Sequence, residues 1–234
     1  MRVKTSLVAA MVLLWSTQAL AQFEHPDLKS GKKRVHSLLF MPAQVSLIKV
    51  GMKGAEPMTE ESRQTEVSLS SVIGNVLQQL GYKVDQDALA PAVLEKDSDL
   101  RYTVDDLQKK FDDELRRMAH KAKDVRKGRF TLGDEVTKLA AGEGVDALLF
   151  VRASGEVLTG NKKAFGFLVM GQAVDVAEMQ FGVVDAKSGD VLYFARPVAF
   201  RNLARDSGKT EGVVKKSFKN FAKASPAGAP PAKE

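Results

Sequence analysis

The stretch 145–201 is rich in apolar residues. This stretch contains three apolar runs, residues 147–151, 179–184 and 191–194, and the turn 185–190 joins the last two. Short apolar runs bounded by turn residues are typical of buried strands. We therefore predict that these runs form the centre of a β-sheet.

The second and third runs predict a hairpin with strands over 174–184 and 191–200. Gly189 stands where the turn favours a positive φ. We expect the second strand to leave central pairing at Arg196-Pro197, because proline has no N–H to donate to a ladder.

Upstream, strands are predicted at 35–41, with a continuation over 43–50 beyond Pro42, and at 82–84, whereas 51–57 is read as a loop. Residues 59–80 predict the strongest helix, because apolar residues recur there at spacings of three and four. That apolar face comprises Val67, Leu69, Val72, Ile73, Val76, Leu77 and Leu80. Gly74 would allow this helix to pack closely.

Two further helices are expected from Thr103 to about residue 127 and from Thr131 to Gly144, with an irregular segment over 85–102. Residues 210–222 predict a basic amphipathic helix. Two interpretations stay open for this last helix: it docks on the sheet, or it binds an external surface. Together these elements predict one α/β (α+β) domain over residues 34–222, with a mixed sheet of about five strands and helices packed on it.

The first 21 residues have the organisation of an export signal. A basic start with Arg2 and Lys4, an apolar run over 7–15 and the small residues 19–21 predict cleavage after Ala21. The apolar run is shorter than the roughly 20 residues of a spanning helix, which disfavours an uncleaved anchor. No cysteine lies near the cleavage point, so we expect a periplasmic protein that is not a lipoprotein.

The two ends of the mature chain are predicted to lie outside the domain. Residues 22–33 are read as a flexible lead-in that carries a basic cluster, either as a solvated linker or as a surface-binding arm. Residues 223–234 are rich in alanine and proline and are expected to be disordered.

The absence of cysteine excludes disulfides and thiolate metal sites, so the domain depends on its hydrophobic core. The net charge is +6 and falls to about +4 without Arg2 and Lys4, a modest basic bias. The three histidines, His25, His36 and His120, are too far apart in sequence to suggest a metal site. We find no nucleotide-binding loop and no nucleophile motif, and we expect no catalytic residues, metal or cofactor and no nucleic-acid partner.

Residues 159–171 are unusually apolar for a connection between strands. Three interpretations are open: a core strand or short helix, an exposed patch for a protein partner, or a loop that touches a membrane. The candidate interaction residues of this segment are Lys162, Lys163, Phe165, Phe167, Leu168 and Met170.

Four segments carry a family resemblance: residues 38–42, the helix end at 80–82, the strand start at 144–149 and the hairpin at 183–192. In their order along the chain they resemble a group of bacterial envelope domains. The group includes the periplasmic domain of the curli secretion protein CsgG, the LpoB-type activators of penicillin-binding proteins and the N-terminal domain of TolB. Several of those proteins are lipid-anchored, whereas this chain has no cysteine to carry a lipid.

The resemblance implies an exported, non-enzymatic module that binds envelope proteins. Two alternatives remain: a peripheral membrane- or cell-wall-binding protein that uses the basic C-terminal helix and residues 164–170, and a small hydrolase without a recognisable motif.

Overall fold

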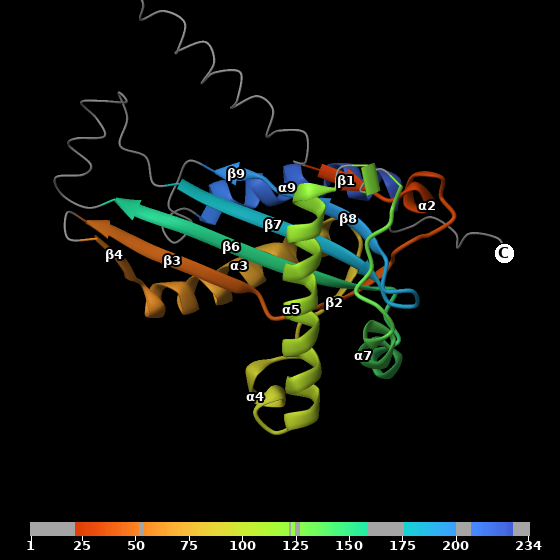
Figure 1. The fold of residues 1–234 in the computed structure, drawn as a ribbon, viewed down its shortest axis with the longest axis horizontal. Coiled ribbons are helices and arrows are strands. Elements are labelled where there is room, and N and C mark those ends of the chain that lie inside the picture. Colours follow the sequence, from red (N-terminus) through yellow and green to blue (C-terminus); the bar gives the residue numbers. More distant parts are fainter. Residues whose placement is uncertain are drawn as a thin grey trace, which may run out of the picture.

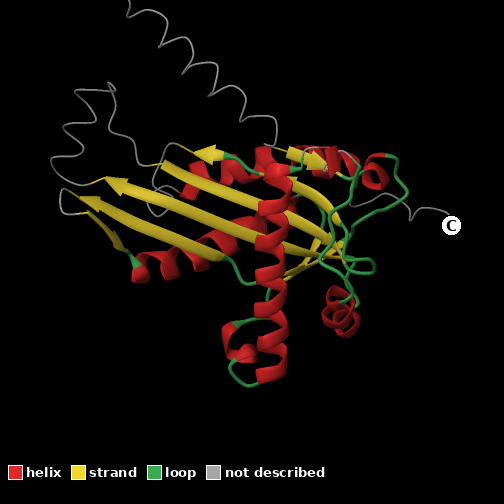
Figure 2. Cartoon of the chain, in the orientation of Figure 1, coloured by secondary structure: helices red, strands yellow, loops and turns green. Residues whose placement is uncertain are grey.

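The computed structural model describes residues 22–51, 54–121, 123–124, 127–158, 176–199 and 207–226. Across these ranges, nine strands form one mixed sheet, and helices cover both of its faces (Figure 1). Figure 2 shows the helices in red on either side of the yellow strands. The predicted α/β class is confirmed, although the sheet has more strands than the five we expected.

The central strand of the sheet is β6 (Ala147–Leu158). On one side it pairs antiparallel with β7 (Val176–Asp185). On its other side it pairs in parallel, first with β2 (Ser37–Phe40) and then with β3 (Gln44–Gly51). The strands predicted from the apolar runs are therefore confirmed as the centre of the sheet.

A bulge separates β2 from β3. Residues 41–43 lie between these strands, whereas only Phe150 and Val151 lie opposite them on β6. Pro42 sits at this point, where it cannot donate a ladder hydrogen bond. The extra residue keeps β3 in the sheet but shifts its register relative to β2.

The outer strands complete the order β1-β8-β7-β6-β2-β5, while β4 pairs with β3 and β9 with β7. Pro197 interrupts the second hairpin strand as predicted, because β8 ends before it and β9 pairs with β7 after it. The outer strands are β1 (Gln22–Glu24), β4 (Gly54–Pro57), β5 (Lys83–Asp85), β8 (Val191–Ala195) and β9 (Val198–Ala199).

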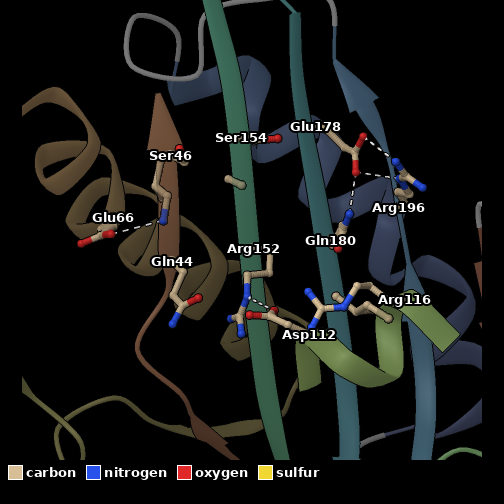
Figure 3. Close-up of a pocket in the computed structure, with 13 residues that line it drawn as sticks. Gln44, Ser46, Glu66, Asp112, Arg116, Arg152, Ser154, Glu178, Gln180 and Arg196 are labelled. Atoms are coloured by element: carbon tan, nitrogen blue, oxygen red, sulfur yellow. Dashed lines mark hydrogen bonds and ion pairs between the residues drawn. The ribbon is translucent and has the colours of Figure 1, made fainter. Parts of the chain in front are cut away.

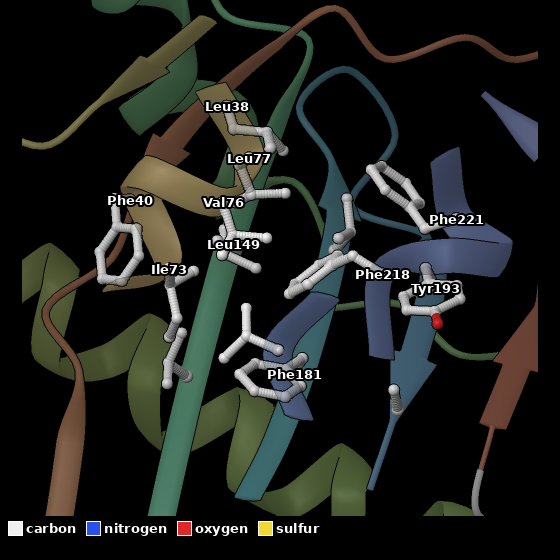
Figure 4. Packing of buried hydrophobic residues seen from close by; sticks show 14 of the residues in the cluster. Leu38, Phe40, Ile73, Val76, Leu77, Leu149, Phe181, Tyr193, Phe218 and Phe221 are labelled. Atoms are coloured by element: carbon white, nitrogen blue, oxygen red, sulfur yellow. The ribbon is translucent and has the colours of Figure 1, made fainter. Parts of the chain in front are cut away.

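One face of the sheet is covered by α3 (Thr59–Gln79) and α9 (Ser207–Ala224). Figure 4 shows Ile73, Val76 and Leu77 of α3, and Phe218 and Phe221 of α9, packed against side chains of the strands. The interpretation of the last helix as docked on the sheet is confirmed. The prediction that Val67 belongs to the apolar face of α3 was wrong, since 67% of this residue is exposed.

Gly74 of α3 lies against the segment that follows β5. A Cβ at this position would collide with the side-chain amide of Gln86, whose Nε2 donates to the carbonyl oxygen of Ser70 at 2.8 Å. The close packing predicted for Gly74 was against the sheet, and this was wrong, because the glycine faces Gln86.

The opposite face is covered by α5 (Ser98–His120) and α7 (Glu135–Glu143). Phe111 of α5 stacks on Phe150 of β6, with 4.5 Å between ring centroids. Gly182 makes room for this contact, because a Cβ at that position would collide with the Phe111 ring. In Figure 1, α5 crosses in front of the strands, and its N-terminal part projects beyond the sheet beside α4 (Pro91–Leu94).

The prediction that residues 22–33 are a flexible lead-in was wrong. The segment starts with β1, which pairs with β8, and continues into α2 (Pro26–Lys29). Phe23 and Leu28 are buried, and the Lys33 ammonium lies 2.9 Å from an Asp190 carboxylate oxygen. Apolar contacts with residues far along the chain therefore order this segment, and its own composition does not reveal them.

The predicted start of the second long helix at Thr103 was also wrong. The Asp97 side chain accepts hydrogen bonds from the N–H groups of Asp99 and Leu100, which places the cap six residues earlier. Thr103 is an interior residue whose hydroxyl donates to the carbonyl oxygen of Asp99. The helix also ends at His120, before the residue 127 we expected.

The C-terminal boundary at residue 222 was too early. The helix α9 continues to Ala224, and Ser225 is fully buried. Its hydroxyl accepts from the Val35 N–H at 2.7 Å, and the Tyr82 hydroxyl donates to its carbonyl oxygen at 2.5 Å. Residues 223–225 therefore belong to the domain.

The expectations for residues 1–21, for the connection 159–175 and for residues 227–234 lie outside the described residues. No helix in the described ranges is both long and apolar enough to cross a lipid bilayer.

We predict that Phe150→Ala lowers the free energy of unfolding by about 3–5 kcal/mol, because it removes a fully buried ring and leaves a cavity against Phe111. Urea unfolding of the mature chain measures this change. The control Val67→Ala, at an exposed position, should change the free energy by no more than about 0.5 kcal/mol. Equal effects of the two substitutions would contradict a central β6.

Candidate functional site

A polar groove of about 640 Å³ lies on the sheet face that α5 crosses, over parts of the strands that α5 leaves open (Figure 3). Side chains of β3, β6, β7 and α5 contribute most of its lining. The lining residues are Gln44, Val45, Ser46, Glu66, Asp112, Leu115, Arg116, Arg152, Ala153, Ser154, Glu178, Gln180 and Arg196.

The groove arises because β6 changes character along its length. Residues 147–151 are completely buried, whereas the next residues alternate between the polar side chains of Arg152 and Ser154 and the buried Ala153. Since successive side chains of a strand point to opposite faces, Ala153 keeps one face covered while its neighbours open the other.

Strand register aligns the polar side chains of the groove in two rows. Gln44, Arg152 and Gln180 are partners across β3, β6 and β7 and form the first row. Ser46, Ser154 and Glu178 form the second row in the same way. Neighbouring strands lie about 4.8 Å apart, so each row presents polar groups at regular intervals across the sheet.

Arg152 ties the groove to α5. Its Nε donates to Asp112 Oδ1 at 2.7 Å, and Nη2 donates to the carbonyl oxygen of Gln108 at 2.9 Å. The guanidinium also lies 5.3 Å from the centre of the Phe111 ring. Burial lowers the pKa of Arg152, and the Asp112 carboxylate partly opposes this effect, so the guanidinium stays charged.

Glu178 and Arg196 form the other charged pair of the groove. The guanidinium donates to both carboxylate oxygens, at 2.6 and 2.8 Å, and Gln180 Nε2 donates to Oε1 at 2.5 Å. Burial alone would raise the pKa of Glu178, but these hydrogen bonds outweigh it and hold the pKa below its usual value. The carboxylate is therefore ionised at neutral pH.

The lining of the groove is mostly polar and charged. Its lining contains no histidine or cysteine, and its carboxylate of lowered pKa is the opposite of a general acid. Among the described residues, no cluster of three histidine, aspartate or glutamate side chains could hold a metal ion. Arginine and carboxylate side chains both line the groove, so it presents charges of both signs.

None of the six interaction residues predicted from the sequence can be compared with this site, since Lys162, Lys163, Phe165, Phe167, Leu168 and Met170 lie outside the described residues. The groove itself was missed. Its signal was the alternation of polar and apolar residues from Arg152 onwards, which is typical of a strand with one polar face. The partner residues on β3 and β7 become neighbours of Arg152 through strand register, which one strand alone does not reveal.

No protein-family model matches the sequence, and no curated protein sequence matches it. Solved structures with similar arrangements include a PelC dodecamer from Paraburkholderia phytofirmans, with 13% identity and a TM-score of 0.41 over 88% of this chain and 96% of that chain. Lipoprotein GNA1162 from Neisseria meningitidis has 15% identity and a TM-score of 0.37, with coverage of 80% and 96%. The LpoB C-terminal domain from Salmonella enterica has 11% identity and a TM-score of 0.31, with coverage of 75% and 90%.

The resemblance to LpoB-type proteins thus recurs among these structures, while those to CsgG and TolB stay predictions. At these identities and scores, the likenesses carry no conclusion about function.

We expect Arg152→Met to lower the free energy of unfolding by about 1.5–3 kcal/mol, because it removes charged hydrogen bonds and leaves Asp112 without its arginine. Urea unfolding measures the change. The matched control is Arg116→Met, whose guanidinium pairs with Asp113 on the surface and should contribute at most about 1 kcal/mol. A smaller loss for Arg152→Met than for the control would show that the α5 contact is not structural.

The ion pair in the groove also predicts a pH dependence. Arg196→Gln should raise the pKa of Glu178 towards its ordinary value, which NMR titration of the side-chain carboxyl measures. A lowered folded-state pKa contributes stability above the unfolded value of about 4.3 and loses it as pH falls through the folded pKa. The stability difference between wild type and variant should therefore be largest at neutral pH and shrink in acid. A pH-independent difference would contradict the pairing.

Proposed function

We propose that this protein is an exported, non-enzymatic interaction module of a bacterial cell envelope, and that the polar groove is its principal contact surface for a partner protein. The observation that carries the proposal is the groove itself: two rows of polar side chains on the part of this sheet face that α5 leaves uncovered. The export signal predicted at residues 1–21 supports the compartment.

The charges of the groove favour a protein partner. Three arginines and three acidic residues line it, so positive and negative groups are balanced. A nucleic-acid surface would require a strong positive excess. A protein surface offers both signs, and complementary placement of charges gives specificity more than affinity.

The groove is smaller than a complete interface. A stable protein interface buries about 800 Å² on each partner, so the contact must extend beyond these residues. The connection 159–175 links Leu158 at the end of β6 to Val176 at the start of β7. The facing pair Glu156–Val176 lies two positions along the ladder from Ser154–Glu178. We therefore propose that Lys162, Lys163, Phe165, Phe167, Leu168 and Met170 contribute to the same interface.

The experiment is crosslinking and affinity capture from the native envelope with the full chain and with Ser154→Trp. Ser154 is exposed in the middle of the groove, so the indole should block a partner while leaving thermal stability within about 0.5 kcal/mol of wild type. We expect the crosslinked partner to be lost. Phe167→Asp is the corresponding variant in the connection 159–175, and we expect it to lose the partner as well.

The matched control is Ser68→Trp, at an exposed position of α3, a helix on the opposite face of the sheet. It should capture the same partner as wild type. If Ser154→Trp retains the partner, or if both tryptophan variants lose it, the groove is not the contact surface.

A further inference from the structure

A second hollow, of about 650 Å³, lies between α3 and α9 on the face opposite the polar groove. Its floor is mainly apolar, and lysines of α9 border it. We call it the lysine-rimmed groove. Its lining residues are Val76, Gln79, Leu80, Lys215, Lys216, Lys219 and Ala222.

The charges around this groove are one-sided. From Val67 to its end at Gln79, α3 contains no charged residue, while α9 carries five lysines and a single acid, Glu211. Glu211 pairs with Lys215 at 2.6 Å. Within the described residues, no carboxylate lies within ion-pair distance of Lys216 or Lys219, so the groove presents uncompensated positive charge.

The apolar face of α9 is not available to a ligand. Val214, Phe218 and Phe221 are fully buried in the core, and the Tyr193 hydroxyl donates to the carbonyl oxygen of Ser217. The helix therefore cannot insert into a bilayer with that face, as a free amphipathic helix does. On a bilayer, α9 can only lie parallel to the surface, with its lysines facing the lipid headgroups. The apolar floor of the lysine-rimmed groove then lies beside these lysines.

We propose that the lysine-rimmed groove docks the protein on an anionic phospholipid bilayer. The lysines from Lys215 to Lys223 extend along about 12 Å of helix, which is wider than one headgroup and suits a surface that presents many. Lysine side chains lay their aliphatic stems on apolar surface while the ammonium groups contact phosphates. With so few charges and no inserted face, the attachment is reversible and sensitive to salt.

Docking through this face leaves the polar groove free, because the two surfaces lie on opposite faces of the sheet. The inference does not depend on the proposed function. A protein attached in this way would present its polar groove away from the bilayer.

The test is co-sedimentation of the mature chain with vesicles. We expect binding to vesicles that contain phosphatidylglycerol at low salt, and none to pure phosphatidylcholine. Binding should disappear in about 1 M salt, where the screening length is about 3 Å. Absence of binding at low salt overturns the proposal, and so does equal binding to both kinds of vesicle.

The deciding variant is the pair Lys216→Glu and Lys219→Glu, which should lower the partition coefficient at least about tenfold. The matched control is Lys96→Glu with Lys109→Glu, an equal charge change at exposed positions away from α3 and α9, which should bind as wild type does. If the control loses as much binding, only net charge matters and the groove is not the site.

Two further measurements keep the result interpretable. Lys216→Gln with Lys219→Gln removes charge without adding carboxylates, and it should also reduce binding to the vesicles. This pair serves as the test if the glutamate pair does not fold. Ser154→Trp should bind vesicles like wild type, which separates this site from the polar groove. Binding to an acidic polypeptide such as polyglutamate with no binding to vesicles would overturn the lipid assignment.

Discussion

A strand that is buried on both faces determines the rest of this architecture. Residues 147–151 of β6 are completely inaccessible, with Leu148 and Phe150 facing α5 and α7, and Leu149 facing α3 and α9. Each face needs its own cover of helices, so a two-layer fold could not accommodate this strand. The helical cover on the α5 side ends where the apolar run ends. From Arg152 onwards the side chains on that face are polar, while Ala153 stays buried on the face that α3 and α9 cover.

This constraint also explains which parts of the fold the sequence predicts. The strand β6, the hairpin and α3 were confirmed because their periodicity reflects their own burial. β1 and α2 were missed because a three-residue strand and a four-residue helix have almost no pattern of their own, and Phe23 and Leu28 become core residues only through distant partners. Thr103 was mistaken for a cap because a threonine cap and an interior threonine look alike until Asp97 is seen to bind the first N–H groups.

The candidate site was less predictable for a related reason. Arg152, Ser154 and Glu178 are ordinary polar residues in sequence, and their arrangement depends on three strands meeting in one register. The lysines of α9 were visible as a basic face, but their setting was not. Packing hides the apolar face of the helix in the core, so its lysines lie on the face that stays exposed beside the end of α3.

The bond between Val35 and Ser225 joins residues 190 positions apart in the chain. The segment that leads into β2 is thus completed by residues close to the end of α9, and β1 likewise pairs with β8, far away in the chain. Contacts of such long range close late, because the chain must first lose the entropy of a large loop. Truncation before Ser225 would therefore remove hydrogen-bond partners from Val35 and Tyr82, which lie far away in the chain.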